Sequence, residues 1–289
     1  MILKQIDKVR ENTAVKKVLN FFEGDLYPVI YAVLVLVCSF TGIELVFYAL
    51  TALVVVFTTI FCRDTKSLMV PLVMAVYAVS QRHTPQPPYN SDYLYRPYVL
   101  GVLGGLFALV LAALIFRLIA YKGTGNVFRT RTKTRAGLLA MAAVLILNGI
   151  FYSGYTIANL VLGIVLAFSF VFFYIYFYNT LEWTEKTAKY AAQMLVLASA
   201  VILIQFLELL IFDDPQNKSQ LILGWGMSNN IGGMLAMFMP ASFYLAYKSK
   251  YGPAYYIFGL LVFVGVVRSL SRTSALIGGG ILIVCMVLL

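Results

Sequence analysis

The chain has 289 residues, of which 61% are hydrophobic and only 12% are charged. A water-soluble domain of this length needs far more charge to cover its surface, so the composition excludes the soluble globular classes. The net charge of +10 lies in short clusters between apolar runs, which argues against a nucleic-acid partner and is typical of a membrane topology signal. We therefore predict one all-α, polytopic integral membrane helical bundle.

Residues 1–25 precede the first apolar run and place basic side chains among apolar positions. These side chains belong to Lys4, Lys8, Arg10, Lys16 and Lys17. The pattern predicts a basic, amphipathic segment that lies on the cytoplasmic leaflet of the membrane. The segment lacks the short apolar stretch and the small-residue cleavage site of a signal peptide.

Residues 26–289 form a series of apolar runs, each near the length of about 20 residues that crosses a hydrocarbon core. The run at 26–61 is too long for one span, and Thr41-Gly42 marks the turn of a hairpin. About ten spans are predicted, at 26–41, 44–62, 67–81, 98–120, 136–153, 156–178, 191–212, 231–247, 253–268 and 272–289. The last span stops inside its own apolar stretch, so we expect the chain to be a fragment of a longer protein.

Three polar connections separate these spans: an interfacial loop at Gln81–Tyr98, a basic loop at Thr124–Arg135 and a polar loop at Asp213–Gly224. With a cytoplasmic N-terminus, most of the 22 Lys and Arg residues fall on the inner side, as the positive-inside rule requires. The residues left on the outer side are Arg82, Arg96, Lys218, Arg268 and Arg272. The charge distribution therefore favours an N-in, ten-span topology.

Motifs of soluble enzymes are absent, since the sequence has no GxGxxG, no P-loop and no HExxH. We interpret the one histidine, His83, as a solvated or interfacial loop residue rather than a catalytic base. Cys38, Cys62 and Cys285 lie in or beside apolar runs without metal-ligand spacing, which indicates small buried hydrophobic residues. No metal ion or other cofactor is predicted.

Two arginines on the outer side, where Lys and Arg are otherwise scarce, form the first candidate site. Arg268 and Arg272 stand four residues apart across the break between the last two spans. Two guanidinium groups there can hold a diphosphate through bidentate contacts. They can equally extend to the lipid head groups as ordinary interfacial anchors. The spacing alone does not separate these interpretations.

The segment Gly224–Gly233 forms the second candidate. Ser228, Asn229 and Asn230 stand at a predicted helix start, where they are good N-cap residues and can offer amide groups to a ligand. The alternative is a capping turn followed by small residues that let helices pack closely. Three adjacent polar residues exceed what one cap needs, which favours a binding role.

Polar residues inside the span at 191–212 form the third candidate. Gln205 and Glu208 lie in its outer half, and an ionisable residue within a span is a functional hypothesis by default. Glu208 either contributes to such a site or forms a structural ion pair that orients Arg268 or Arg272.

The order of motifs in the C-terminal part of the chain resembles the O-antigen ligase and polysaccharide polymerase family of polytopic membrane glycosyltransferases. That family has an Asn-Pro-Asn-like turn opening one helix and a Ser-Arg-Gly/Thr motif opening a helix two spans later. In this chain Ser228-Asn229-Asn230 stands at the first position, and Ser271-Arg272-Thr273 matches the second.

This resemblance implies a metal-independent glycan transfer from undecaprenyl diphosphate on the outer face of the cell inner (cytoplasmic) membrane. The implied substrate-binding residues are Arg272, Arg268, Ser271, Asn229, Asn230, Glu208 and Lys218. Arg272 would be the main contact of the diphosphate leaving group, whose developing charge must be stabilised. Glu208 would orient an arginine, and Lys218 stands where the family often has another arginine. The family's candidate base, a loop histidine, would lie beyond Leu289.

The alternative from another class is a transporter or flippase of a lipid-linked or amphiphilic substrate, and a non-catalytic membrane scaffold is a third. A transporter needs a polar path through the bilayer. The polar residues within these spans are few, and they lie mainly toward the outer side of the membrane. A scaffold leaves the paired outer arginines unexplained. Ligase and polymerase share the motifs, so the sequence leaves the choice between them open.

Overall fold

The computed structural model describes residues 2–80, 96–122, 134–151, 157–213, 215 and 217–288. These residues are mainly helical, which confirms the predicted all-α class, and one small hairpin interrupts them. The α-helices are α1 (Ile2–Arg10), α2 (Thr13–Phe22), α3 (Leu26–Thr41), α4 (Glu44–Phe61), α5 (Met69–Met74), α7 (Pro97–Lys122), α8 (Thr134–Phe151), α9 (Ile157–Thr180), α10 (Glu185–Phe212), α11 (Ser228–Lys248), α12 (Gly252–Arg268) and α13 (Arg272–Leu288). The 3-10 turns are η1 (Lys66–Leu68), η2 (Ala75–Ala78) and η4 (Lys218–Gln220).

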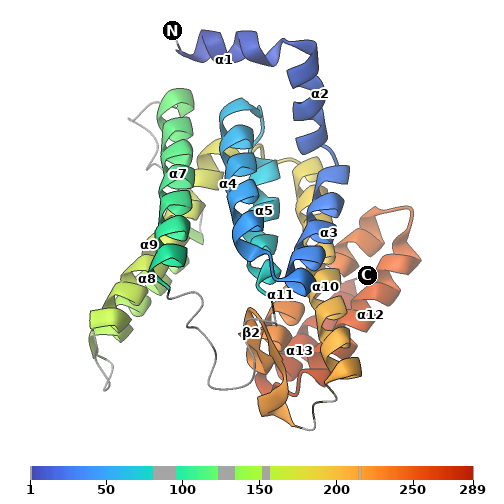
Figure 1. Cartoon of the computed structure of the whole chain (residues 1–289). Helices are drawn as coiled ribbons and strands as arrows, with labels where there is room; N and C mark the ends of the chain where they lie inside the picture. Colours follow the sequence, from blue (N-terminus) through green and yellow to red (C-terminus); the bar gives the residue numbers. More distant parts are fainter. Residues whose placement is uncertain are drawn as a thin grey trace.

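The helices form three groups side by side (Figure 1): α7–α9, then α3–α5, then α10–α13. The main core joins the second and third groups through buried side chains such as Tyr77, Phe206, Leu235 and Met239. A smaller core, with Tyr176 at its centre, joins α4 and η1 to α7 and α9.

Several helices have the length and the apolar composition of membrane spans. Three of the described helices are long and apolar enough to cross a membrane: α4, the Pro97–Ala120 part of α7, and α10. Helices α2 and α3 pass the same test together, although they are bent by 68° at the break between them. Shorter apolar helices occupy most of the other predicted spans, including α12 and residues 272–287 of α13.

Three predicted segments differ from the structure. The span expected at 67–81 is a shorter segment, Lys66–Ala78, that is broken into η1, α5 and η2 without a gap between them. The loop expected at Asp213–Gly224 contains η4 and strand β1 (Ile222–Leu223), which pairs antiparallel with β2 (Gly226–Met227). The loop with His83 and most of the basic loop after α7 lie outside the described residues.

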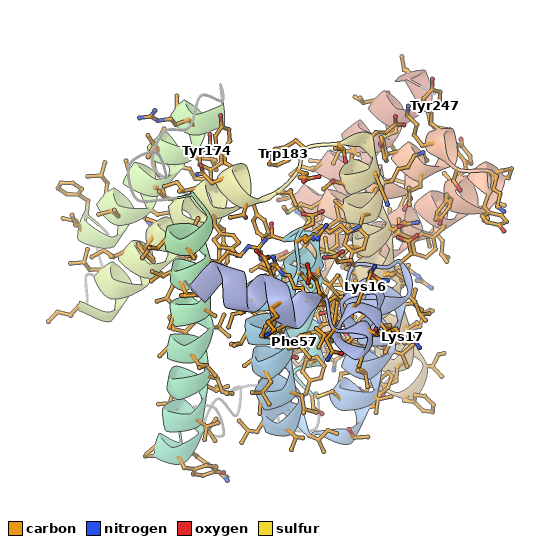
Figure 2. All side chains as sticks on the ribbon, turned by 90° about the horizontal axis from the view of Figure 1, so that it is seen from above. Lys16, Lys17, Phe57, Tyr174, Trp183 and Tyr247 are labelled. Atoms are coloured by element: carbon orange, nitrogen blue, oxygen red, sulfur yellow. The ribbon has the colours of Figure 1, made fainter. Side chains whose placement is uncertain are left out.

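Helix α1 crosses one end of the molecule (Figure 1), and the view from above shows it over α4, with Lys16 and Lys17 on the adjoining α2 (Figure 2). Arg10 of α1 donates to backbone carbonyls at the end of α4 over 2.6–3.4 Å. The buried Arg117 of α7 donates to carbonyls of the same region over 2.6–2.8 Å. The acceptors of the two arginines are Thr59, Ile60, Phe61, Cys62 and Arg63.

These contacts explain why two arginines meet at one helix end. The last carbonyls of a helix have no partner within the helix, and a cation there also opposes the negative end of the helix dipole. Arg10 and Arg117 therefore bind α1 and α7 to the C-terminal end of α4. This role could not be predicted from the residue types, because backbone carbonyls leave no pattern in them.

Candidate anion-binding site

A groove of about 790 Å³ opens between the start of α11 and the break that separates α12 from α13. Its walls come from η4, α11, α12, the break and α13. The lining residues are Lys218, Asn229, Val267, Leu270, Ser271, Arg272, Thr273 and Ala275. The structure thus brings together Lys218, Asn229, Ser271 and Arg272, which the sequence resemblance assigns to substrate binding.

A tight turn places Arg272 at the groove. Helix α12 ends at Arg268 and α13 begins at Arg272, so three residues reverse the chain. Among the described non-glycine residues, only Leu270 in this turn has a positive φ, at 56°. A left-handed conformation is costly for a branched side chain and persists only where the surroundings impose it. The surrounding structure therefore holds this turn in a defined conformation.

Buried serines hold the turn in place. Ser269 donates its hydroxyl to the carbonyl of Val266 at 2.7 Å. Ser271 is the N-cap of α13: its hydroxyl oxygen lies 3.4 Å from the Ser274 N–H and 2.8 Å from the Ser274 hydroxyl. Because an N-cap side chain satisfies one unpaired N–H of the first turn, Ser271 has a structural role as well as a place in the groove wall.

Gly232 of α11 lets the turn approach α11 closely. A Cβ atom at Gly232 would overlap the Ser269 hydroxyl and would lie 2.9 Å from Cβ of Ser274. The neighbouring Gly233 faces open space, with no atom within 4 Å of such a Cβ. The absence of a side chain at Gly232 therefore sets the distance between the starts of α11 and α13.

The start of α11 differs from the sequence prediction. The N-cap is Met227, which makes no side-chain cap hydrogen bond, so the alternative in which Ser228 or its neighbours only cap the helix is wrong. Ser228 is instead buried against the core, and Asn229 is exposed in the first turn. A helix start without a side-chain cap keeps N–H groups available to a ligand.

Positive charge and helix polarity converge in the groove. Lys218 and Arg272 contribute two cations, and no ion pair among the described residues involves either of them. Helices α11 and α13 both begin at the groove, and the start of a helix carries a partial positive charge. No carboxylate or imidazole lines the groove within the described part of the chain. The arrangement is suited to binding an anion, and it offers no group to remove a proton.

Other predicted residues lie outside the groove. Arg268 and Asn230 are exposed but do not line it, and the Asn230 side chain packs against Gly226 of the hairpin. Glu208 does not line it either, and no ion pair among the described residues joins Glu208 to Arg268 or Arg272. The role of Glu208 in orienting an arginine stays a prediction.

Four lining residues were not assigned to the site from the sequence: Thr273, Leu270, Val267 and Ala275. Thr273 belongs to the Ser271–Thr273 motif and adds a hydroxyl to the groove. Leu270 shapes the groove through its backbone, and no residue preference indicates a left-handed leucine. Only the first of these could have been found from the motif.

Gln205 supports the site instead of belonging to it. Its amide donates to the carbonyl of Tyr77 at 2.7 Å and accepts from the indole N–H of Trp225 at 2.8 Å. Trp225 also packs edge-on against Tyr77, with ring centroids 4.7 Å apart. Next to it, Gly224 lies directly against the backbone of Val79 and Ser80. These contacts fix the hairpin that leads into α11.

Comparison with known proteins gives no match for this chain among protein-family models, curated proteins or solved structures. The site therefore rests on the geometry above and on the motif resemblance.

Proposed function

We propose that this chain is a membrane glycosyltransferase-like protein of the O-antigen ligase or surface polysaccharide polymerase type. In this proposal the groove between α11 and α13 holds the diphosphate of an undecaprenyl-diphosphate-linked glycan, and Arg272 is its main contact. One observation supports this most: Lys218, Asn229, Ser271 and Arg272 meet in one groove, and no carboxylate among the described residues lines it. A diphosphate leaving group needs such a set of donors, because the charge that develops on it must be stabilised.

The proposal includes the N-in, ten-span topology in the cell inner membrane. Figure 1 shows β2, which leads directly into α11, at the opposite end of the molecule from α1. In this topology the basic α1 and α2 lie at the cytoplasmic leaflet, and the groove lies on the outer face. Basic residues are scarce on this outer face, and diphosphate binding explains why Lys218 and Arg272 are present there.

Within the pair of arginines, the proposal assigns the two roles separately. Arg272 lines the groove and binds the leaving group, whereas Arg268 does not line it and is an interfacial anchor. The rival transporter function gains no support from Gln205, since its side chain is used between Tyr77 and Trp225 and lines no polar path.

Glycan transfer in the full-length protein tests the proposal. The Arg272→Ala variant should lose transfer by about 100-fold or more, with expression and topology unchanged. The Arg268→Ala variant is the matched control and should retain most of the activity. Normal transfer by Arg272→Ala would refute the assignment. Flux of a labelled lipid-linked glycan across proteoliposomes, without covalent transfer, would support the transporter instead.

A further inference from the structure

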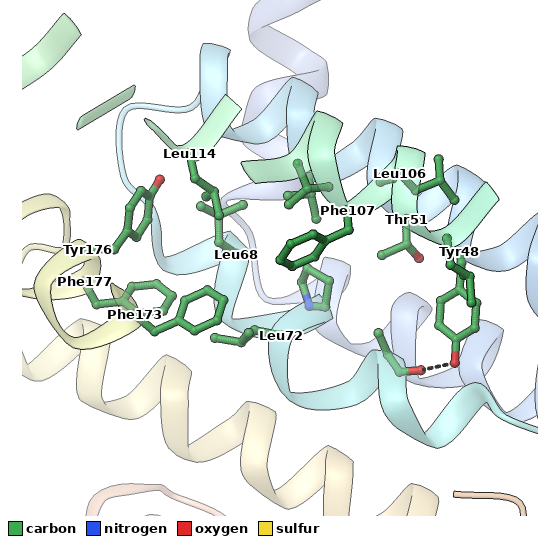
Figure 3. A pocket seen from close by; sticks show the side chains of 16 residues that line it. Tyr48, Thr51, Leu68, Leu72, Leu106, Phe107, Leu114, Phe173, Tyr176 and Phe177 are labelled. Atoms are coloured by element: carbon green, nitrogen blue, oxygen red, sulfur yellow. Dashed lines mark hydrogen bonds between the residues drawn. The ribbon is translucent and has the colours of Figure 1, made fainter. Parts of the chain in front are cut away.

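A second cavity, of about 310 Å³, lies between α4, the broken segment η1–α5–η2, α7 and α9. Figure 3 shows Phe107 of α7 and Phe173 of α9 on its walls, with Leu68 and Leu72 of the broken segment between them. Small residues, Ala52 and Ala75, are also part of the lining.

The lining offers almost nothing to a polar ligand. The Tyr48 hydroxyl donates to the carbonyl of Ala75 at 3.3 Å, drawn as a dashed line in Figure 3. The Thr51 hydroxyl is hydrogen-bonded to Tyr31 at 3.0 Å. The third hydroxyl of the lining, that of Tyr176, is buried and has no hydrogen-bond partner among the described residues. The other walls are aliphatic and phenyl groups. A head group would lose its hydration here and gain at most this one hydroxyl, so a hydrocarbon fits best.

The position of the cavity indicates which hydrocarbon can enter it. Its lining residues fall well inside α4 and the Pro97–Ala120 part of α7, two helices long and apolar enough to cross a membrane. Leu72 and Phe107 are both lining residues and exposed, at 45% and 65%. The cavity therefore opens sideways at the depth of lipid chains rather than of head groups.

We propose that this cavity binds one acyl chain of a membrane phospholipid. A void of this size between packed helices loses the dispersion contacts of its walls unless something fills it, and acyl chains are what surrounds its mouth. The bound chain fills the space between α7–α9 and α4–α5. This inference depends on the membrane location of the chain and is independent of the proposed transfer reaction.

Photolabelling of the whole chain tests the inference. The protein is reconstituted in phosphatidylglycerol vesicles that contain a phosphatidylglycerol with a diazirine in the middle of one acyl chain. After irradiation, adducts are mapped to single residues. The buried lining residues Ala52 and Val55 should be labelled, because only an inserted chain reaches them. The exposed neighbour Leu53 should be labelled in every case by the surrounding lipid.

Two variants that fill the cavity should abolish the label at Ala52 and keep it at Leu53. Ala75→Phe occupies the interior, and Leu72→Trp closes the mouth, so a folding defect in one leaves the other informative. Ala112→Phe, at an exposed position of α7 that does not line the cavity, is the control and should change nothing. Wild-type labelling confined to Leu53 would overturn the inference. Displacement of the label at Ala52 by undecaprenyl phosphate, but not by unlabelled phosphatidylglycerol, would overturn the choice of an acyl chain.

Discussion

Arginines at the two ends of this molecule have opposite surroundings. At the end that carries α1, the guanidinium groups of Arg10 and Arg117 donate hydrogen bonds to backbone carbonyls at the C-terminal end of α4. At the break between α12 and α13, Arg268 and Arg272 are exposed, and no described ion pair involves them. The first pair holds elements of the fold together, whereas we propose that Arg272 of the second pair binds a ligand.

The difference shows how a structural cation can be told from a binding cation in a membrane protein. A buried guanidinium is tolerated when backbone carbonyls accept its N–H groups, and removing it then damages the fold. A guanidinium at a groove, without a carboxylate beside it, contributes little to folding. Removing it should affect ligand binding alone. Each of the following variants tests one side of this contrast.

Loss of Arg117 should have the largest effect on stability. Arg117→Ala leaves buried carbonyls of Thr59, Cys62 and Arg63 without donors, at a cost on the order of 3 kcal/mol. Denaturant titration of the purified protein in detergent, followed by circular dichroism, measures the change. Arg63→Ala is the control, because it keeps its backbone carbonyl and removes only an exposed side chain. Equal unfolding midpoints for both variants would show that the α4 end does not depend on Arg117.

A side chain at Gly232 should damage both the fold and the groove. Gly232→Ala forces the Ser269–Ser274 turn away from α11, which we expect to cost about 1–3 kcal/mol and to weaken diphosphate binding. Gly233→Ala faces open space and should be neutral in both respects. Unfolding and prenyl-diphosphate binding are measured for both variants. The difference between them gives the effect of the close contact between the turn and α11, apart from any general effect of replacing a helical glycine by alanine.

Loss of Gln205 should have a smaller effect, centred on the hairpin. Gln205→Leu removes the hydrogen bonds to Tyr77 and Trp225, which should destabilise the protein by about 1–2 kcal/mol and shift Trp225 fluorescence to the red. Gln193→Leu on the same helix is the matched control. An unchanged Trp225 spectrum in Gln205→Leu would mean that the hairpin is held by Gly224 packing alone.

The smallest effect is expected for Arg268. Because its side chain is exposed and does not line the groove, Arg268→Ala should change the free energy of unfolding by no more than about 0.5 kcal/mol. Binding of a prenyl diphosphate should also stay close to that of the wild type. A loss of binding comparable to that of Arg272→Ala would remove the distinction between the two arginines.

Sequence reasoning predicted the helical membrane class and the grouping of Arg272 with Asn229, because apolar run length and motif order carry that information. It could not separate Arg268 from Arg272, since only the folded turn shows that Arg272 lines the groove and Arg268 does not. It treated Gln205 as a possible functional residue and missed Arg117, because the partners of both include backbone carbonyls. The broken segment around Pro71 also escaped prediction, since its composition is that of a regular span.

Equilibrium binding of radiolabelled farnesyl diphosphate to the purified chain tests the central claim most directly. The probe carries the diphosphate without the glycan, so it isolates the role of the groove. Binding should be saturable in the wild type and in Arg268→Ala, and should fall by about tenfold or more in Arg272→Ala, since a charged contact is worth at least 1.4 kcal/mol. Equal affinities for Arg272→Ala and the wild type would contradict the account.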